Sequence, residues 1–152
     1  MSTTSSGASW RAALNHGAEA LERWLSLDLV LLASRLGIAA VFFQSGRTKV
    51  DGLLGVSDGA VVLFRDEYRL PLLDPAFAAH AAAYAEHLFP ILLVVGLFTR
   101  GAALALLGMT LVIQVFVYPD AWPTHLSWAA PLLLLVARGA GAWSVDRPLG
   151  LR

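Results

Sequence analysis

The sequence contains no cysteine and few charged residues: 14% are charged and 57% are hydrophobic. Without cysteine, the chain itself cannot hold disulfides, Fe–S clusters, thiolate metal sites or a CxxC redox pair. Basic and acidic residues balance to a net charge of zero, which excludes a basic surface for nucleic acid. P-loop, GxSxG, HExxH and EF-hand patterns are also missing, so any catalysis would need a borrowed cofactor or partner. A chain this apolar, with a mean hydropathy of +0.65, is predicted to lie in a membrane.

Four apolar segments approach the roughly 20 residues that a helix needs to cross a bilayer. They are residues 27–46, 76–98, 101–119 and 123–140. These segments predict an all-α fold, a four-helix transmembrane bundle with a long first loop at about 47–75. Within that loop, "VVLFRDEYRLPLL" mixes apolar and charged residues, and we expect it to lie over the bundle with its apolar side down.

Apolar residues recur at helical spacing before the first span, from Trp10 through Leu14 and Leu21 to Trp24. This pattern predicts an N-terminal amphipathic helix at the membrane interface, with a packed surface helix as the alternative. The chain is therefore divided into residues 1–26, a polar N-terminus with an interfacial helix, and residues 27–152, a four-span membrane domain. No basic n-region precedes the first span and no A-x-A site follows it, so we expect this span to be retained.

Basic residues predict the orientation, because an even number of spans puts both termini on one side. That side carries Arg11, Arg23, Arg100, Arg138, Arg147 and Arg152, and the other side carries Arg47, Lys49, Arg65 and Arg69. The excess of six over four predicts cytoplasmic N- and C-termini.

Ionisable residues within the spans are costly, and three stand near mid-span. Arg35 lies near the middle of the first span, and Glu86 and His87 lie near the middle of the second. Antiparallel helices would bring them to similar depth, and an ion pair would remove much of the cost of a buried charge. We therefore predict that Glu86 neutralises Arg35. The pair could serve only to fix helix packing, and His87 could be a core histidine or a proton-handling group beside Glu86.

Other polar and aromatic residues fall nearer the first loop and predict a pocket beneath it. The candidates are Lys49, His80, Tyr84, Gln114, Tyr118, His125 and Trp128. His80 and His125 could instead lie among the lipid headgroups. A haem held by these two histidines is another alternative, but two separated histidines are a weak signal, and neither haem nor a metal site is expected.

Three stretches of the sequence contain recognisable motifs: "SRLGIAAVFFQSGRTKVDGLLG", "FRDEYRLPLLDPAFAAHAAAYAEHLFPILLVVGLFTR" and "GAGAWSVDRPLG". Together they resemble the DoxX family of small bacterial and archaeal membrane proteins. The residues that carry the resemblance are Arg35, Phe42, Gly46, Lys49, Phe64, Leu70, Pro71, Glu86, Gly96, Leu97, Thr99, Arg100, Gly139, Gly141, Ser144 and Asp146. The spacing within "FRDEYRLP" departs slightly from the family pattern. The resemblance covers roughly residues 30–150 and leaves the N-terminal segment outside.

The resemblance implies a four-helix membrane bundle, multi-pass in a bacterial inner (plasma) membrane. The family resembles the membrane subunit of a thiosulfate:quinone oxidoreductase. The implied function is thus an accessory subunit of a quinone-linked membrane redox complex, with a quinone as candidate cofactor. Candidate partners are the lipid bilayer, a redox protein and further copies of the chain. The alternatives are a non-enzymatic scaffold or assembly factor, and a small-molecule or proton pathway. No catalytic residue can be carried over from the family.

Overall fold

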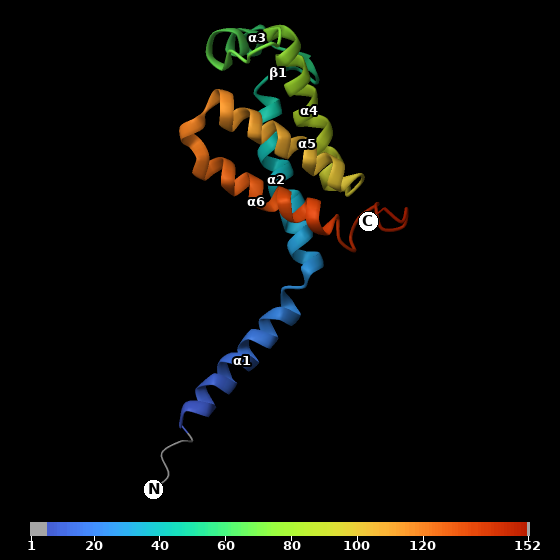
Figure 1. Cartoon of the computed structure of the whole chain (residues 1–152). Helices are drawn as coiled ribbons and strands as arrows, with labels where there is room; N and C mark the ends of the chain where they lie inside the picture. Colours follow the sequence, from blue (N-terminus) through green and yellow to red (C-terminus); the bar gives the residue numbers. More distant parts are fainter. Residues whose placement is uncertain (1–5, 152) are drawn as a thin grey trace.

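A computed structural model describes residues 6–151, and these fold into a helical bundle with one helix projecting from it (Figure 1). The long helices are α1 (Ser6–Trp24), α2 (Leu27–Arg47), α4 (Pro75–Val95), α5 (Thr99–Val112) and α6 (Trp122–Arg138). The shorter elements are β1 (Val50–Asp51), β2 (Gly55–Val56), α3 (Asp58–Leu63), η1 (Phe64–Tyr68), η2 (Ile113–Val117) and η3 (Pro119–Ala121). The bundle consists of α2, α4, α5 and α6, so the all-α prediction is confirmed.

Local sequence signals set the ends of the bundle helices. The Ser26 hydroxyl accepts a hydrogen bond from the Leu29 amide at 3.3 Å and so caps the start of α2. Asp74 caps α4 in the same way, accepting from the Phe77 amide at 2.9 Å. Pro75 occupies the first position of α4, where its missing N–H costs nothing. At the other end α4 stops at Gly96, whose φ of 73° is the left-handed conformation common at helix C-termini.

Within the described residues, three helices are long and apolar enough to cross a membrane: Leu27–Arg47, Pro75–Val95 and Thr99–Val117. They coincide with the first three predicted spans. The fourth predicted span forms α6, a helix of 17 residues with Pro131 inside it. At 1.5 Å per residue α6 is about 26 Å long, slightly less than the roughly 30 Å of a bilayer core. The structure thus contains the fourth helix, and its crossing stays a prediction.

The packing of α2 against α4 depends on two glycines. A Cβ on Gly46 would lie 3.0 Å from the Glu86 Cβ and 2.9 Å from the His87 Nδ1. A Cβ on Gly96 would lie 2.7 Å from the Arg35 Nη2. Gly46 therefore faces Glu86, and Arg35 faces the end of α4 near Gly96. These two close approaches define the antiparallel register of the helices.

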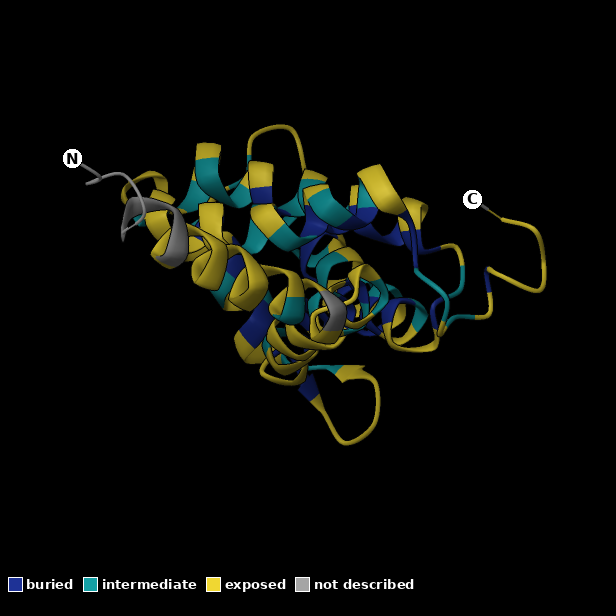
Figure 2. Ribbon diagram, turned by 90° about the horizontal axis from the view of Figure 1, so that it is seen from below, coloured by how far each residue is buried: buried dark blue, intermediate teal, exposed yellow. Residues whose placement is uncertain are grey.

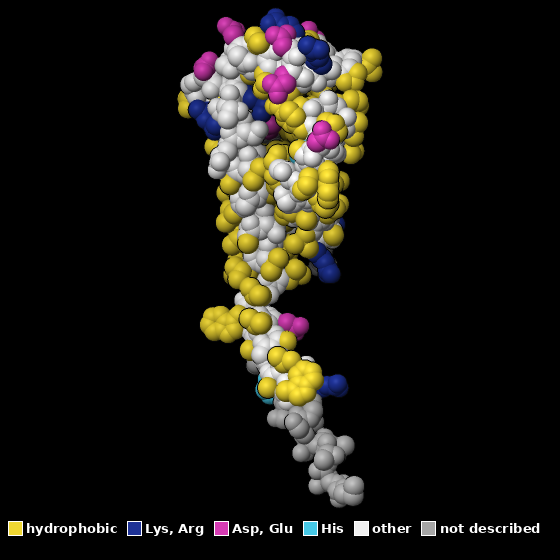
Figure 3. All heavy atoms as spheres, turned by 90° about the vertical axis from the view of Figure 1, so that its left-hand side faces the viewer, with side chains coloured by type: hydrophobic (Ala, Val, Ile, Leu, Met, Phe, Trp, Pro, Cys, Tyr) yellow, Lys and Arg dark blue, Asp and Glu magenta, His cyan; other side chains and the backbone are white. Residues whose placement is uncertain are grey.

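Buried residues lie where the helices face one another, and the outward faces of the helices remain exposed (Figure 2). The main core consists of Leu31, Ile38, Ala39, Phe42, Leu93, Ala102, Ala103, Leu106, Leu132 and Leu135. In the space-filling view, hydrophobic side chains cover the flank of the bundle, and acidic and basic side chains gather at the end formed by the first loop (Figure 3). This distribution suits a bundle whose flank contacts lipid.

The first loop folds over one end of the bundle, as the sequence predicts. A two-stranded hairpin pairs Val50 with Val56, and α3 and η1 follow it. Phe64 is 5% exposed and packs with Ala78 and Ala79 of α4. Tyr68 and Leu70 pack against the same cluster. The loop therefore covers the end of the bundle rather than extending into water.

Helix α1 extends away from the bundle (Figure 1). Its large apolar side chains are uncovered: Trp10 is 55% exposed, Leu14 63%, Leu21 62% and Trp24 84%. These side chains do not pack against the bundle in the described structure, and the choice between an interfacial helix and a packed surface helix stays open. The helix lies where the sequence predicts it, within the segment 1–26, and its place at the membrane interface stays a prediction.

Candidate functional site

Arg35 is 1% exposed, and its guanidinium binds backbone carbonyls instead of a carboxylate. The Nε donates to the Leu93 carbonyl at 2.7 Å, and the Nη2 donates to the Val94 carbonyl at 2.7 Å. The Nη1 donates to the carbonyls of Ala140 at 3.0 Å and Trp143 at 2.7 Å. Carbonyls at a helix end lack partners within the helix. Arg35 thus ties the end of α4 and the segment after α6 to the middle of α2.

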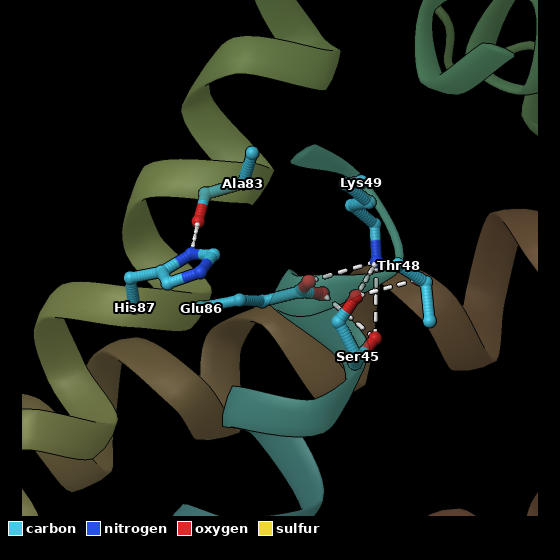
Figure 4. Close-up of polar contacts among 6 residues, drawn as sticks. All are labelled: Ser45, Thr48, Lys49, Ala83, Glu86 and His87. Atoms are coloured by element: carbon cyan, nitrogen blue, oxygen red, sulfur yellow. Dashed lines mark hydrogen bonds and ion pairs between the residues drawn. The ribbon is translucent and has the colours of Figure 1, made fainter. Parts of the chain in front are cut away.

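The predicted ion pair between Arg35 and Glu86 is wrong. The Glu86 Oε2 lies 2.7 Å from the Lys49 Nζ, and the side chains of Glu86 and Lys49 are 4% and 6% exposed (Figure 4). The Lys49 Nζ also donates to the hydroxyl of Ser45 at 3.0 Å. The cause is the helix register: Gly46 faces Glu86, and Arg35 lies about three turns earlier on α2. The positions of Arg35 and Glu86 within their predicted spans did not reveal that the two residues are offset along the paired helices.

His87 lies on α4 beside Glu86, and it is 7% exposed (Figure 4). Its Nδ1 lies 2.7 Å from the carbonyl of Ala83, which can only accept, so Nδ1 carries the proton in this bond. The ring packs edge-on against Phe43, with centroids 5.2 Å apart. Among the described residues, the buried Nε2 has no hydrogen-bond partner. His87 is therefore a buried histidine with one nitrogen satisfied by its own helix.

A cavity of about 470 Å³ lies beneath the first loop, between α2, α4 and the chain from α5 to α6. We call it the loop cavity. Its aromatic lining residues are Phe42, Phe64, Tyr68, Phe77, Tyr118, His125 and Trp128. One face of α4 contributes small side chains, namely Ala78, Ala81, Ala82 and Ala85. The Lys49–Glu86 ion pair and Ser45 form the most polar part of the wall. The site is thus mostly apolar, with a few polar groups at defined positions.

Four of the candidate pocket residues line the loop cavity: Lys49, Tyr118, His125 and Trp128. Gln114 supports one of them, because its Oε1 lies 2.6 Å from the His125 Nδ1. The His125 and Trp128 rings lie 5.3 Å apart. The Gln114 Nε2 donates to the Pro119 carbonyl at 2.7 Å, which fixes the amide orientation. The bond from Nδ1 to Gln114 leaves the His125 Nε2 as the nitrogen available to another group.

His80 and Tyr84 lie outside the loop cavity. The His80 Nδ1 donates to the Ala76 carbonyl at 2.7 Å, and its ring lies 6.1 Å from the ring of Tyr84. Both side chains are exposed on another face of α4. Because His125 lines the loop cavity and His80 does not, the described structure does not bring these two histidines into one cavity.

Tyr68, which the sequence did not assign to the pocket, lines the loop cavity, and Glu67 binds the cavity residue Tyr118. Tyr118 donates a hydrogen bond to the Glu67 carboxylate, and its ring lies 5.8 Å from that of Tyr68. The bond to Glu67 raises the pKa of Tyr118, and burial raises the pKa of Tyr68. Both phenols are therefore protonated at neutral pH. The aromatic residues of "FRDEYRLP" were the signal for this part of the site.

The segment after α6 forms a second cluster at the other end of the bundle. The Asp146 carboxylate accepts from the amides of Phe98 at 2.7 Å and Thr99 at 3.0 Å, and so caps α5 from a distant part of the chain. Asp28, in the first turn of α2, accepts from the Ala142 amide at 2.7 Å. The C-terminal segment is thus fastened to α5 and to α2, because Arg35 of α2 also binds its carbonyls.

The apolar helices, the buried ion pair and the loop cavity define a small helical membrane protein with a candidate ligand site. The family profile described as DoxX matches residues 30–119, and the chain belongs to the DoxX family. A protein of Haemophilus influenzae described as uncharacterized is 29% identical over 126 residues, covering 76% of this chain and 80% of that protein. No solved structure matches the chain.

Proposed function

We propose that this DoxX protein is an accessory subunit of a quinone-linked membrane redox complex and that the loop cavity takes the quinone ring. The observation that carries the proposal is the loop cavity itself, about 470 Å³ with an apolar and aromatic wall. Ligand sites of this kind combine such a wall with a few polar groups that orient the ligand. A quinone ring is flat and apolar and carries two carbonyl acceptors, so it matches this lining.

Specific residues could hold such a ring. Phe42 and Trp128, with ring centroids 5.6 Å apart, offer aromatic contacts. The His125 Nε2 could donate to a quinone carbonyl when protonated, or accept from a quinol hydroxyl when neutral. The ion pair of Lys49 and Glu86 places one ammonium and one carboxylate group in the cavity wall, without net charge. A quinone would supply two-electron chemistry, and the chain would bind and orient it.

The redox partner is a second component of the proposal. Because the chain has no cysteine, an Fe–S cluster ligated by cysteine would have to be held by another protein. The exposed apolar flank of the bundle offers surface for lipid and for the helices of such a partner (Figure 3).

Filling the loop cavity is expected to weaken quinone binding. Ala85 lines the cavity from α4, so Ala85→Leu places extra carbon atoms inside it. We expect the affinity for a short-chain ubiquinone to fall by about tenfold or more, measured by quenching of tryptophan fluorescence in detergent. Ala40→Leu is the matched control, because Ala40 is exposed on α2 and does not line the cavity. Its affinity should equal that of the wild type.

Equal affinities in the two variants would contradict the assignment of the loop cavity. If the wild type binds no quinone but purifies with a stable partner, the scaffold or assembly role is the better interpretation. If it has neither ligand nor partner, the small-molecule or proton pathway is favoured. Extraction of lipid-soluble ligands from the purified protein separates the first outcome from the other two.

We also propose four crossings of a bacterial inner membrane, with both termini cytoplasmic. Lys49 is buried against Glu86, so the loop end exposes three basic side chains, Arg47, Arg65 and Arg69. The other side has six in the sequence, including Arg152, which lies outside the described residues. This bias favours cytoplasmic termini. A helix as short as α6 can cross by local thinning of the bilayer.

Cysteine labelling tests the orientation cleanly, because the chain has no cysteine of its own. Leu72 in the first loop and Leu149 near the C-terminus are exposed and suitable for replacement. In intact cells a membrane-impermeant maleimide is expected to label Leu72→Cys and to spare Leu149→Cys until the cells are lysed. The opposite pattern would reverse the orientation. Labelling of both variants in intact cells would mean that α6 does not cross.

A further inference from the structure

A second cavity, of about 870 Å³, lies at the opposite end of the bundle from the loop cavity. We call it the C-terminal cavity. Asp28 at the start of α2, Thr99 and Arg100 at the start of α5, and Arg138 at the end of α6 all line it. The segment after α6, including Asp146 and Arg147, completes the wall. It is a separate site, built at the ends of helices and by the C-terminal segment.

Three arginines share this wall, namely Arg100, Arg138 and Arg147. None of the three forms an ion pair at 4.0 Å or less with a carboxylate whose side chain the structure describes. Arg100 makes one long hydrogen bond, from its Nη2 to the Ala137 carbonyl at 3.3 Å. The C-terminal cavity therefore contains guanidinium donors that are available to an anion.

The two carboxylates in the same wall are already engaged by backbone amides. Asp28 accepts from the Ala142 amide, and Asp146 accepts from the amides of Phe98 and Thr99. These bonds hold the carboxylates within the fold, away from pairing with the arginines. With three cations and two anions, the wall has a surplus of positive charge.

Thr99 gives an independent sign of a missing partner. The residue is 0% exposed, and its hydroxyl has no hydrogen-bond partner among the described residues. Buried polar groups in folded proteins are almost always hydrogen-bonded, so an orphaned hydroxyl in a cavity wall points to a ligand. A phosphate oxygen would accept from this hydroxyl as well as from the arginines.

We propose that the C-terminal cavity binds the phosphate group of an anionic phospholipid. The planar guanidinium matches phosphate geometry and binds it by paired hydrogen bonds. The cavity lies at the ends of helices that are apolar enough to cross a membrane, which is where headgroups lie. Phe98 lines the cavity and is 60% exposed, so an acyl chain could continue along the apolar flank beside it. A soluble phosphate ester shares the headgroup chemistry but would not use that flank.

Thermal unfolding of the full chain in detergent micelles, with added lipid, tests the proposal. We expect dioleoylphosphatidylglycerol to raise the melting temperature saturably and dioleoylphosphatidylcholine to leave it unchanged. Arg138→Gln with Arg147→Gln removes two exposed charges from the site and should weaken this binding by about tenfold or more. Arg65→Gln with Arg69→Gln removes two exposed charges at the loop end and should leave the affinity unchanged.

A second variant tests the site without changing its charge. Thr99→Val keeps the shape of the side chain and removes the hydroxyl, so the lipid-free protein should melt no earlier than the wild type while its affinity for phosphatidylglycerol falls. Equal affinities in the wild type and the cavity variants would overturn the proposal. Saturable stabilisation by inorganic phosphate at constant ionic strength, lost in Arg138→Gln with Arg147→Gln, would replace the lipid by a soluble phosphate ester. That result would overturn the lipid assignment.

Discussion

Arg35→Met is expected to prevent stable folding of the bundle. The substitution removes the donor of four hydrogen bonds to backbone carbonyls, two at the end of α4 and two in the segment after α6. A hydrogen bond to a charged group contributes roughly 1.5–3 kcal/mol, so the expected loss exceeds about 5 kcal/mol. Domains are commonly stable by only about 5–15 kcal/mol. Thermal unfolding in detergent, followed by circular dichroism, measures the effect.

Two further variants show whether the loss comes from this site. Arg47→Met changes an exposed arginine on the same helix, which donates to the carbonyls of Gly52 and Leu53 in the adjoining turn, and it should cost less than about 1 kcal/mol. Arg35→Lys keeps the charge but lacks the planar fork, so it should remain strongly destabilising. A wild-type melting temperature for Arg35→Met would refute the structural role of this arginine.

The sequence predicted the places of the bundle helices because long apolar runs define them locally. The structure caps the starts of α2 and α4 at Ser26 and Asp74 and ends α4 at Gly96, two residues before the predicted end of that span. It also predicted that Arg35 is buried and matters, since a charge within an apolar helix needs a partner. It did not predict the partners. The register comes from glycine contacts between helices, and two of the four carbonyls come from a segment more than one hundred residues away. Such contacts leave no local pattern.

Part of the candidate pocket could be predicted from the sequence, because the position of a residue along its span sets its depth in the bundle. Lys49 lies just after α2 and His125 lies near the start of α6, both at the loop end of the bundle, and depth alone brings them to one cavity. For α4, the sequence did not show which face of the helix is turned toward the cavity. Its cavity face carries Ala78, Ala82 and Ala85, whereas His80 and Tyr84 lie on a different face. The small residues that create the space are less conspicuous in the sequence than the polar residues beside them.

Lys49 illustrates how one contact changes two predictions. In the sequence it counted as a loop charge on the extracytoplasmic side and as a candidate pocket residue. In the structure it is 5% exposed and neutralises Glu86. The loop end thereby loses a surface charge, which strengthens the predicted orientation, and the pocket gains an ion pair in its wall. Both consequences follow from the same register that separates Arg35 from Glu86.

Glu86→Gln is expected to destabilise the bundle by about 3–5 kcal/mol, because it leaves the Lys49 ammonium buried without a counterion. Lys49→Met should have a similar cost, since it leaves the carboxylate buried. The double variant Lys49→Met with Glu86→Gln should recover much of the loss, because neither charge remains. Chemical or thermal unfolding of the wild type, the two single variants and the double variant gives the coupling energy of the pair.

Two other double-mutant cycles make the result specific. Arg35→Met with Glu86→Gln should show losses that add, because the two side chains bind different partners. Where Arg35→Met alone abolishes folding, Arg35→Lys replaces it in this cycle. The exposed pair of Arg65 and Asp66, with side chains 59% and 62% exposed, should show a coupling below about 1 kcal/mol.

Strong coupling of Glu86 to Arg35, with none to Lys49, would reinstate the original pairing and reject the register described above. If the double variant of Lys49 and Glu86 folds but binds quinone weakly, the pair serves the loop cavity as well as the stability of the bundle.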